Sequence, residues 1–339
     1  MSAPAKTKTA HMELAAVAGT PLKISRVGLG TWAIGGWMWG GSDEKQAIRT
    51  IQAAFGHGIT LVDTAPVYGF GHSEEMVGKA LAEAGLRNSA IIATKVGLDW
   101  KDGQPFRNAA PARIMFEVEA SLKRLRTDHI DIYQVHWPDP KTPIAETADA
   151  MRRLFEQGKI GAIGVSNFSV AQMDEFRKAA PLHVLQPPYN LFERAAESEL
   201  LPYCRAHGIA TLGYGALCRG LLSGRIGPAT HFDGDDLRLK DPKFQPPYFE
   251  QYLKAVTRLK KFADERYGKS IIDLAVRFGL DSGITAALWG ARRPDQLEAV
   301  DGVSGWSLDD AAKAEIEKIL VEEIPRPIGP EFMAPPESA

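Results

Sequence analysis

Short apolar segments alternate with amphipathic segments along most of this chain, and this alternation constrains its fold more than any other feature. Strands that are apolar on both faces belong to parallel sheets whose outer face is covered by helices. The chain therefore predicts an α/β fold. The predicted strands are Val27–Thr31, Ile59–Asp63, Ala90–Lys95, Ile130–His136, Ile160–Val165, Val184–Gln186, Ile209–Gly213 and Ile284–Leu288.

The segments between the strands carry apolar residues at helical spacing, which predicts a helix after each of several strands. Ser73 and Ser169 stand where N-caps are expected, and Pro111 and Pro143 suit first-turn positions. The predicted helices are Asp43–His57, Ser73–Glu83, Pro111–Arg126, Pro143–Gln157, Ser169–Lys178 and Ala196–His207.

Eight strand–helix units fit either a closed (β/α)8 TIM barrel or an open doubly wound sheet. The barrel is favoured because polar residues gather at one end of every strand, where barrel active sites lie. A β-hairpin is predicted over Met12–Val17 and Leu22–Ser25, and an extra C-terminal helix over Leu308–Glu322. Residues 12–339 are predicted to form one barrel domain, and residues 1–11 a disordered tail.

Composition narrows the functional classes. The formal net charge of −2 carries no sign of the basic surface that nucleic acids or membrane surfaces require. Two cysteines, Cys204 and Cys218, show neither disulfide nor metal-site spacing, and no apolar leader is visible. We expect a cytoplasmic protein that acts on a small molecule, without a bound metal. Nothing in the composition predicts the oligomeric state.

Four polar side chains follow three consecutive strands and are candidates for catalysis. Asp63 ends the second strand and Tyr68 follows it, Lys95 ends the third strand and His136 ends the fourth. Each alone has an ordinary structural explanation, such as a turn, a solvated strand end or core packing. Together they are expected at one mouth of the barrel, because parallel strands end on the same side.

The chemistry of the four groups is that of a proton donor. A free tyrosine has a pKa near ~10, so a buried Lys95 ammonium is expected to lower the pKa of Tyr68, and Asp63 to keep Lys95 charged. His136 is expected to donate a hydrogen bond to a carbonyl oxygen. No side chain at this mouth is an evident nucleophile, which predicts hydride transfer from a cofactor.

The run from Asp63 to Gly69, followed by Ser73-Glu74, resembles the signature of the aldo-keto reductase superfamily, and Lys95 and His136 fall where that pattern expects them. The resemblance extends from Leu29 to Pro294 and is closer to the bacterial and channel-β-subunit-like branches than to the aldose reductase type. It implies reversible, NADPH-dependent reduction of an aldehyde or ketone to the alcohol, with Tyr68 as the proton donor.

The same resemblance implies a set of cofactor contacts. Ser166, Asn167 and Gln186 would hold the nicotinamide carboxamide, and Tyr214 would stack on the nicotinamide ring. The segment from Gly215 to Arg225 would cover the pyrophosphate, although the family's usual Ser-Pro is here Gly215-Ala216. The further implied contacts are Trp32, Asp63, Leu217, Cys218, Gly220, Arg225 and Gly290.

Arg292 and Arg293 stand at the predicted start of a helix, where cations are slightly unfavourable. An anionic ligand explains them better. By the resemblance, Arg292 would meet the 2′-phosphate of NADPH, Arg293 would stack on adenine and Gln296 would contact adenosine. This assignment predicts NADPH/NADP+ in preference to NADH.

Aromatic residues cluster near the strand ends and form either rim packing or a substrate funnel; they are Trp32, Trp37, Trp39, Trp100, Phe106 and Trp137. We expect Trp32, Tyr68, His136 and Trp137 to contact substrate. The segment from Pro325 to Phe332 is a candidate cover for the mouth.

Two other functions fit part of the pattern. Lys95 could act as the amine of a Schiff-base aldolase. Alternatively, the protein could be a non-enzymatic nucleotide sensor that resembles channel β-subunits. A metal hydrolase is not expected, because no His-x-His or His-x-x-x-His pair occurs.

Overall fold

The computed structural model describes residues 11–337, and in it eight parallel strands close into a barrel. All eight predicted strands are present, and the predicted (β/α)8 barrel is confirmed. In order around the barrel the strands are β3 (Val27–Gly30), β4 (Leu61–Asp63), β5 (Ile91–Val96), β8 (Ile132–Val135), β9 (Ile163–Ser166), β10 (Val184–Gln186), β11 (Ala210–Gly213) and β12 (Ala286–Gly290), with β12 pairing to β3.

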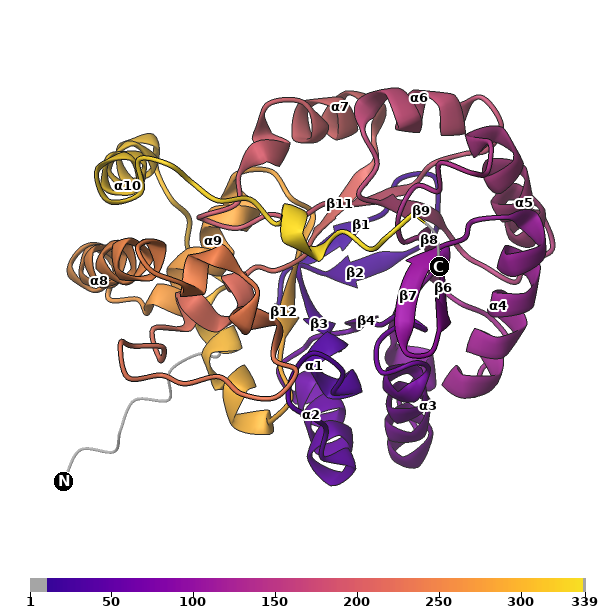
Figure 1. Cartoon of the computed structure of the whole chain (residues 1–339), viewed down its shortest axis with the longest axis horizontal. Helices are drawn as coiled ribbons and strands as arrows, with labels where there is room; N and C mark the ends of the chain where they lie inside the picture. Colours follow the sequence, from indigo (N-terminus) through magenta and orange to yellow (C-terminus); the bar gives the residue numbers. More distant parts are fainter. Residues whose placement is uncertain (1–10, 338–339) are drawn as a thin grey trace.

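Helices surround the barrel (Figure 1). The predicted extra helix is present as α10 (Asp310–Glu323), whereas α8 (Tyr248–Tyr267) and α9 (Ile271–Asp281) lie between β11 and β12, where no helix range was predicted. The others are α1 (Trp32–Gly35), α2 (Glu44–Gly56), α3 (His72–Ala84), α4 (Pro111–Leu125), α5 (Ile144–Glu156), α6 (Val170–Arg177) and α7 (Leu200–His207).

Two antiparallel hairpins accompany the barrel. The predicted N-terminal hairpin consists of β1 (Leu14–Ala16) and β2 (Lys23–Ser25). The second, β6 (Leu98–Lys101) with β7 (Gln104–Arg107), follows β5 and was not predicted. Of the predicted N-terminal tail, residues 1–10 lie outside the described residues. The single-domain assignment stays a prediction.

Three local predictions were wrong. Pro143 is the N-cap residue of α5 and does not lie in its first turn. Ser73 does not cap its helix: the N-cap is Gly71, and the buried Ser73 hydroxyl lies 2.7 Å from Thr31 Oγ1 and 2.9 Å from Thr64 Oγ1. This hydroxyl therefore connects the start of α3 to the ends of β3 and β4.

The helix expected from Ala196 begins only at Leu200, because a 3-10 turn, Ala195–Glu197, precedes it. Ser169 caps α6 as predicted, with a capping box to Gln172.

The inside of the barrel is apolar below and polar above. Leu61, Ile132, Val184, Leu212 and Ala286 belong to one buried apolar cluster contributed by the barrel strands. At the carboxyl ends of the strands, buried polar side chains replace them, among them Asp63, Lys95, Gln134, Ser166 and Gln186. The apolar layer supports this polar layer from beneath and thereby positions the site.

The segment after α10 runs across the barrel from α10 to the β6–β7 hairpin (Figure 1). Lys243 Nζ donates to Gly329 O at 3.0 Å. The Arg107 backbone N–H donates to Pro336 O at 3.1 Å, and its Nε donates to Pro335 O at 3.2 Å. The C-terminal segment thus lies over the mouth, as its sequence suggested.

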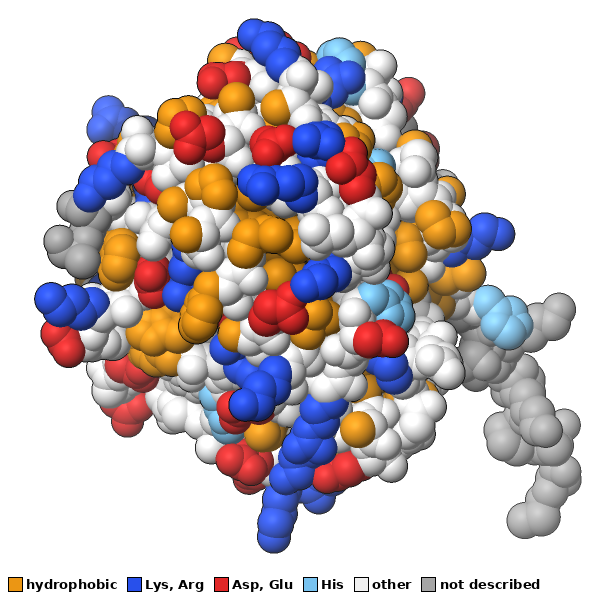
Figure 2. All heavy atoms as spheres, turned by 90° about the vertical axis from the view of Figure 1, so that its right-hand side faces the viewer, with side chains coloured by type: hydrophobic (Ala, Val, Ile, Leu, Met, Phe, Trp, Pro, Cys, Tyr) orange, Lys and Arg blue, Asp and Glu red, His pale blue; other side chains and the backbone are white. Residues whose placement is uncertain are grey.

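On the face of the molecule shown in Figure 2, positive and negative side chains are interspersed with apolar ones. No helix among residues 11–337 is long and apolar enough to cross a membrane.

Gly78 allows α3 and α4 to approach closely, and its replacement tests this packing. A Cβ on Gly78 would lie 2.4 Å from Arg124 O, whereas a Cβ on Gly56, in α2, meets no atom within 4 Å. We expect Gly78→Ala to lower the free energy of unfolding by about 1–3 kcal/mol. Gly56→Ala is the matched control and is expected to raise it by up to about 1 kcal/mol. Denaturant unfolding measures both; equal stability of the two variants would contradict the packing argument.

Candidate active site

A fully buried ammonium group forms the base of the site. Lys95 Nζ donates to Asp63 Oδ1 at 2.7 Å, to Thr64 O at 3.0 Å and to Tyr68 Oη at 3.3 Å. An ammonium has three hydrogens, so all of them are partnered within the protein. The Tyr68 hydroxyl is an acceptor in this contact, which leaves its own hydrogen available to a substrate.

Burial dominates the electrostatics of this group. Desolvation lowers the pKa of Lys95, and the Asp63 carboxylate opposes that shift. Desolvation, with Asp63 as the second cause, raises the pKa of Tyr68 well above 10. The expected lowering of the pKa of Tyr68 is therefore not met, because burial and the Asp63 carboxylate both raise it. Tyr68 consequently stays protonated at neutral pH, as a proton donor must be.

His136 lies beside Tyr68, with ring centroids 5.8 Å apart and planes at 82°. Its backbone N–H donates to Val96 O at 2.7 Å, which fixes it against the end of β5. Desolvation, followed by repulsion from Lys95, holds the pKa of His136 well below 6.5. The neutral imidazole carries one N–H, so it can donate one hydrogen bond to an oxygen bound beside Tyr68.

Two cavities meet above these residues. The narrow cleft encloses about 210 Å³ and includes Gly30, Trp39, residues 215–217 and residues 290–292 in its lining. The wide cavity encloses about 560 Å³ and includes Trp37, His136, Trp137 and residues 332–336. Trp32, Tyr68, Tyr214 and Met333 line both cavities, so the Tyr68 side chain stands at their junction.

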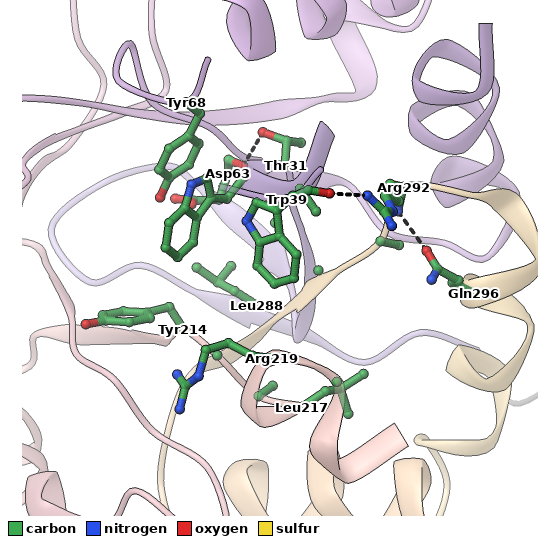
Figure 3. Close-up of a pocket in the computed structure, with 18 of the residues that line it drawn as sticks. Thr31, Trp39, Asp63, Tyr68, Tyr214, Leu217, Arg219, Leu288, Arg292 and Gln296 are labelled. Atoms are coloured by element: carbon green, nitrogen blue, oxygen red, sulfur yellow. Dashed lines mark hydrogen bonds between the residues drawn. The ribbon is translucent and has the colours of Figure 1, made fainter. Parts of the chain in front are cut away.

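Figure 3 shows the narrow cleft, with Tyr68 and Asp63 toward one end and Arg292 and Gln296 toward the other. Arg292 Nη1 donates to Trp39 O at 2.6 Å, and the Arg292 backbone N–H donates to Gln296 Oε1 at 2.9 Å. Burial and the neighbouring Arg238 lower the pKa of Arg292. Among residues 11–337, Arg292 forms no salt bridge with a carboxylate, so its charge is available to an anion.

Most residues expected at the cofactor line one of the two cavities. The narrow cleft is lined by Trp32, Asp63, residues 214–217, Gly220, Gly290, Arg292 and Gln296. The wide cavity is lined by Ser166, Asn167 and Gln186. Cys218, Arg225 and Arg293 line neither. Cys218 is fully buried, and Arg225 and Arg293 each form a salt bridge with Asp295.

The residues expected at the nicotinamide form a hydrogen-bonded group. Asn167 Nδ2 donates to His136 O and to Ser166 Oγ, each at 3.0 Å, and Tyr214 Oη donates to Asn167 Oδ1 at 2.9 Å. Gln186 Nε2 donates to Asp63 Oδ2 at 2.7 Å. Ser166 Oγ donates to Gln186 O at 2.8 Å, so these contacts connect the end of β9 to the tyrosine after β11 and to the Asp63–Lys95 pair.

The four residues expected at the substrate, Trp32, Tyr68, His136 and Trp137, all line the wide cavity. Trp37 does so too, whereas Trp39 lines the narrow cleft and Trp100 and Phe106 line neither. Gln104 and Pro105, from the β6–β7 hairpin, were not predicted. Their segment carries no pattern that separates it from an ordinary loop.

Two further residues line the narrow cleft: Arg219 belongs to the segment expected over the pyrophosphate, whereas Arg238 was not predicted. Arg219 is buried and contacts both Glu193 and Asp241, which holds the turn after β11 in the cleft wall. Arg238 lies over the Trp39 ring at 5.3 Å. Neither of these contacts was predicted from the sequence. Among the described residues, no group of three or more His, Cys, Asp or Glu side chains could hold a metal ion.

Comparison with known proteins identifies the family. Residues 26–321 match the model of the aldo/keto reductase family, and the chain belongs to that family. It is 60% identical to the aldo-keto reductase YhdN of Bacillus subtilis over 326 residues, which cover 96% of this chain and 98% of that protein. A glycerol dehydrogenase structure from Gluconobacter oxydans matches with a TM-score of 0.86 and 53% identity, covering 97% of this chain and 100% of that chain.

More distant relatives differ in function. An NADH-specific methylglyoxal reductase of Escherichia coli is 38% identical and covers 86% of this chain and 93% of its own length. A probable voltage-gated potassium channel β subunit of Arabidopsis thaliana is 31% identical, and the match covers 82% of this chain and 86% of that protein. The predicted family and branch are thus confirmed: the chain is an oxidoreductase that acts on carbonyl or alcohol groups with a nicotinamide cofactor.

The depressed pKa of His136 predicts a flat titration. We expect its ring carbon and nitrogen NMR signals, assigned through their loss in His136→Gln, to stay at the neutral-imidazole positions from pH 8 to about 6. Below the ordinary histidine pKa the unfolded chain takes up a proton that the folded chain refuses, so this residue lowers stability as the pH falls. A midpoint at or above 6.5 would contradict the assignment.

Proposed function

We propose that the protein reduces an aldehyde or ketone to the alcohol with NADPH, reversibly, and that Tyr68 supplies the proton. The observation that carries this proposal is the placement of Tyr68. Its hydroxyl accepts a hydrogen bond from a fully buried ammonium and stands where the narrow cleft meets the wide cavity. A carbonyl group bound in the wide cavity would therefore reach both a proton donor and a cofactor bound in the narrow cleft.

The narrow cleft suits a dinucleotide. At Gly290 an added Cβ would meet no atom within 4 Å, so this strand end opens directly into the cleft, and Gly215 and Gly220 have positive φ angles of 73° and 91°. Such backbone lets N–H groups approach phosphates closely. Tyr214, Ser166, Asn167 and Gln186 would hold the nicotinamide end. When bound, the cofactor supplies a hydride to the carbonyl carbon.

The protein's own residues handle the proton. Tyr68 donates its hydroxyl hydrogen to the carbonyl oxygen while the carbon gains the hydride, which yields the alcohol and a phenolate. Lys95 Nζ, 3.3 Å from Tyr68 Oη, stabilises that phenolate. Asp63 holds the ammonium in place, and the neutral His136 donates a hydrogen bond to the carbonyl oxygen. In the reverse direction the phenolate accepts the proton.

Arg292 supports NADPH over NADH. Its half-buried guanidinium lies at the end of the cleft away from Tyr68. The neighbouring Arg238 and Arg293 are each paired with a carboxylate, Asp236 and Asp295, whereas Arg292 is not. A 2′-phosphate placed there would gain charge-assisted hydrogen bonds. Arg293 is paired with Asp295, so we assign the phosphate to Arg292 and adenine stacking to Arg293.

The geometry does not support an aldolase that uses Lys95. Its ammonium is fully buried, and all three hydrogens are engaged. A Schiff-base lysine must present a neutral amine to its substrate.

Tyr68→Phe tests the proton donor. We expect kcat for a carbonyl panel to fall by about 10²–10⁴, the usual contribution of a positioned acid. Binding of NADPH, measured by the quenching of tryptophan fluorescence, should persist because the cleft is intact. Turnover at the parental rate would overturn the assignment of Tyr68, and loss of both activity and binding would show only damage to the cleft.

Arg292→Ala tests the cofactor preference. Loss of a hydrogen bond to a charged group should raise KM for NADPH roughly 10- to 100-fold and leave KM for NADH almost unchanged. Arg293→Ala is the matched control, because a residue that stacks on adenine should affect both cofactors equally. An equal effect of Arg292→Ala on both cofactors would contradict the 2′-phosphate assignment.

A further inference from the structure

A glutamine that neither the family resemblance nor the proposed mechanism uses lies within the buried polar layer. Gln134, in β8, is fully buried and pairs in register with Lys95 on β5. Its Oε1 accepts from Gln186 Nε2 at 3.3 Å, and its Nε2 lies 3.4 Å from Asp63 Oδ2. Gln134 therefore touches both a residue of the proton-donating group and a residue expected at the nicotinamide.

The three side chains connect opposite walls of the barrel. Asp63 is on β4 and Gln186 on β10, and four strand-to-strand steps separate these strands in either direction. Their contact of 2.7 Å consequently crosses the barrel interior, with Gln134 on β8 between them. Gln186 uses one amide hydrogen on Asp63 and the other on Gln134, so its orientation is determined by both partners.

Gly164 provides the space for this arrangement. It lies on β9, between Gln134 and Gln186 in the sheet, and pairs in register with both Gln134 and Val184. A Cβ at Gly164 would stand 2.7 Å from Gln134 Cγ, which is closer than real Cβ contacts. The absence of a side chain at this position allows Gln134 to lie across β9 toward Gln186.

We propose that Gln134 is a positioning residue that orients the Asp63 carboxylate and the Gln186 amide together, and so couples the proton-donating group to the cofactor site. Asp63 Oδ1 serves Lys95, while Oδ2 is held by the two glutamines. Without Gln134 the carboxylate is free to rotate away from Lys95, and the Gln186 amide is free to turn. This inference rests on the proposed function, because it assigns Gln134 a role through Asp63 and Lys95.

Gln134→Leu removes both contacts at similar volume. We expect kcat to fall roughly tenfold, as for one lost hydrogen bond to a charged group, with KM for the carbonyl substrate little changed. The alkaline limb of the kcat–pH profile should move to lower pH, because Asp63 then supports the charge of Lys95 less well. Gln52→Leu is the control: Gln52 bonds Ala80 O at 3.2 Å, far from the site, and should change neither quantity.

Gln134→Glu gives an independent signature if the leucine variant fails to fold. Its buried carboxyl beside Asp63 should have a raised pKa, so that at acid pH it is protonated and works like the glutamine. We expect activity near the parental level at low pH and a steep loss as this carboxyl ionises. Gly164→Ala, which displaces Gln134 without changing it, should reproduce the tenfold loss of kcat.

The outcomes separate the two proposals. Parental kcat and an unshifted pH profile in both Gln134 variants would overturn the positioning role, while the loss of turnover in Tyr68→Phe still stood. Full activity in Tyr68→Phe would overturn the proposed function itself. Binding of NADPH by the Gln134 variants, monitored by tryptophan fluorescence, completes the test. Gln186 is only one of the residues expected at the nicotinamide, so a loss of affinity smaller than the loss of kcat, together with the shifted pH profile, supports the positioning role. A loss of affinity that accounts for the whole loss of kcat, with an unshifted pH profile, contradicts it.

Discussion

The site depends on a charged lysine that is kept entirely out of water. Transferring an ammonium and a carboxylate into a protein interior costs several kcal/mol per ion unless every hydrogen and lone pair finds a partner. Lys95 meets this condition through Asp63, Thr64 and Tyr68. Asp63 meets it through Lys95 and the two glutamines. The barrel can satisfy both ions because its strand ends converge on one point.

The same condition orders the residues around the pair. Since Lys95 occupies the acceptor side of the Tyr68 hydroxyl, the hydroxyl hydrogen is left for a substrate. Burial keeps Tyr68 protonated and His136 neutral, so each carries the hydrogen that its proposed role requires. The hydrogen-bonded group of Ser166, Asn167 and Tyr214 extends the polar layer to the place where a nicotinamide would lie. The residues proposed for proton donation and those proposed for cofactor binding thus share one buried network.

The repetitive part of the molecule was predictable from sequence, whereas contacts made by irregular segments were not. Eight apolar runs predicted the strands, because burial on both faces leaves continuous apolar segments in the sequence, and the polar residues at their ends favoured the barrel. Asp63, Tyr68, Lys95 and His136 were found because each follows or ends a predicted strand. Gln104 and Arg238, by contrast, reach the cavities from a hairpin and a long loop, whose course depends on tertiary contacts. The pKa of Tyr68 was predicted in the wrong direction, since the depth of burial is not visible in the sequence.

The most direct test of this account is the charge state of Lys95 in the folded protein. Nitrogen-15 NMR of lysine-labelled protein, with the Lys95 signal assigned through its loss in Lys95→Met, reports whether the side-chain nitrogen is an ammonium. The account predicts an ammonium at neutral pH, with a pKa below 10.5, and conversion to the neutral amine at neutral pH when Asp63 is replaced by Asn. A neutral amine in the parent protein at pH 7, or an ammonium unaffected by Asp63→Asn, would contradict it.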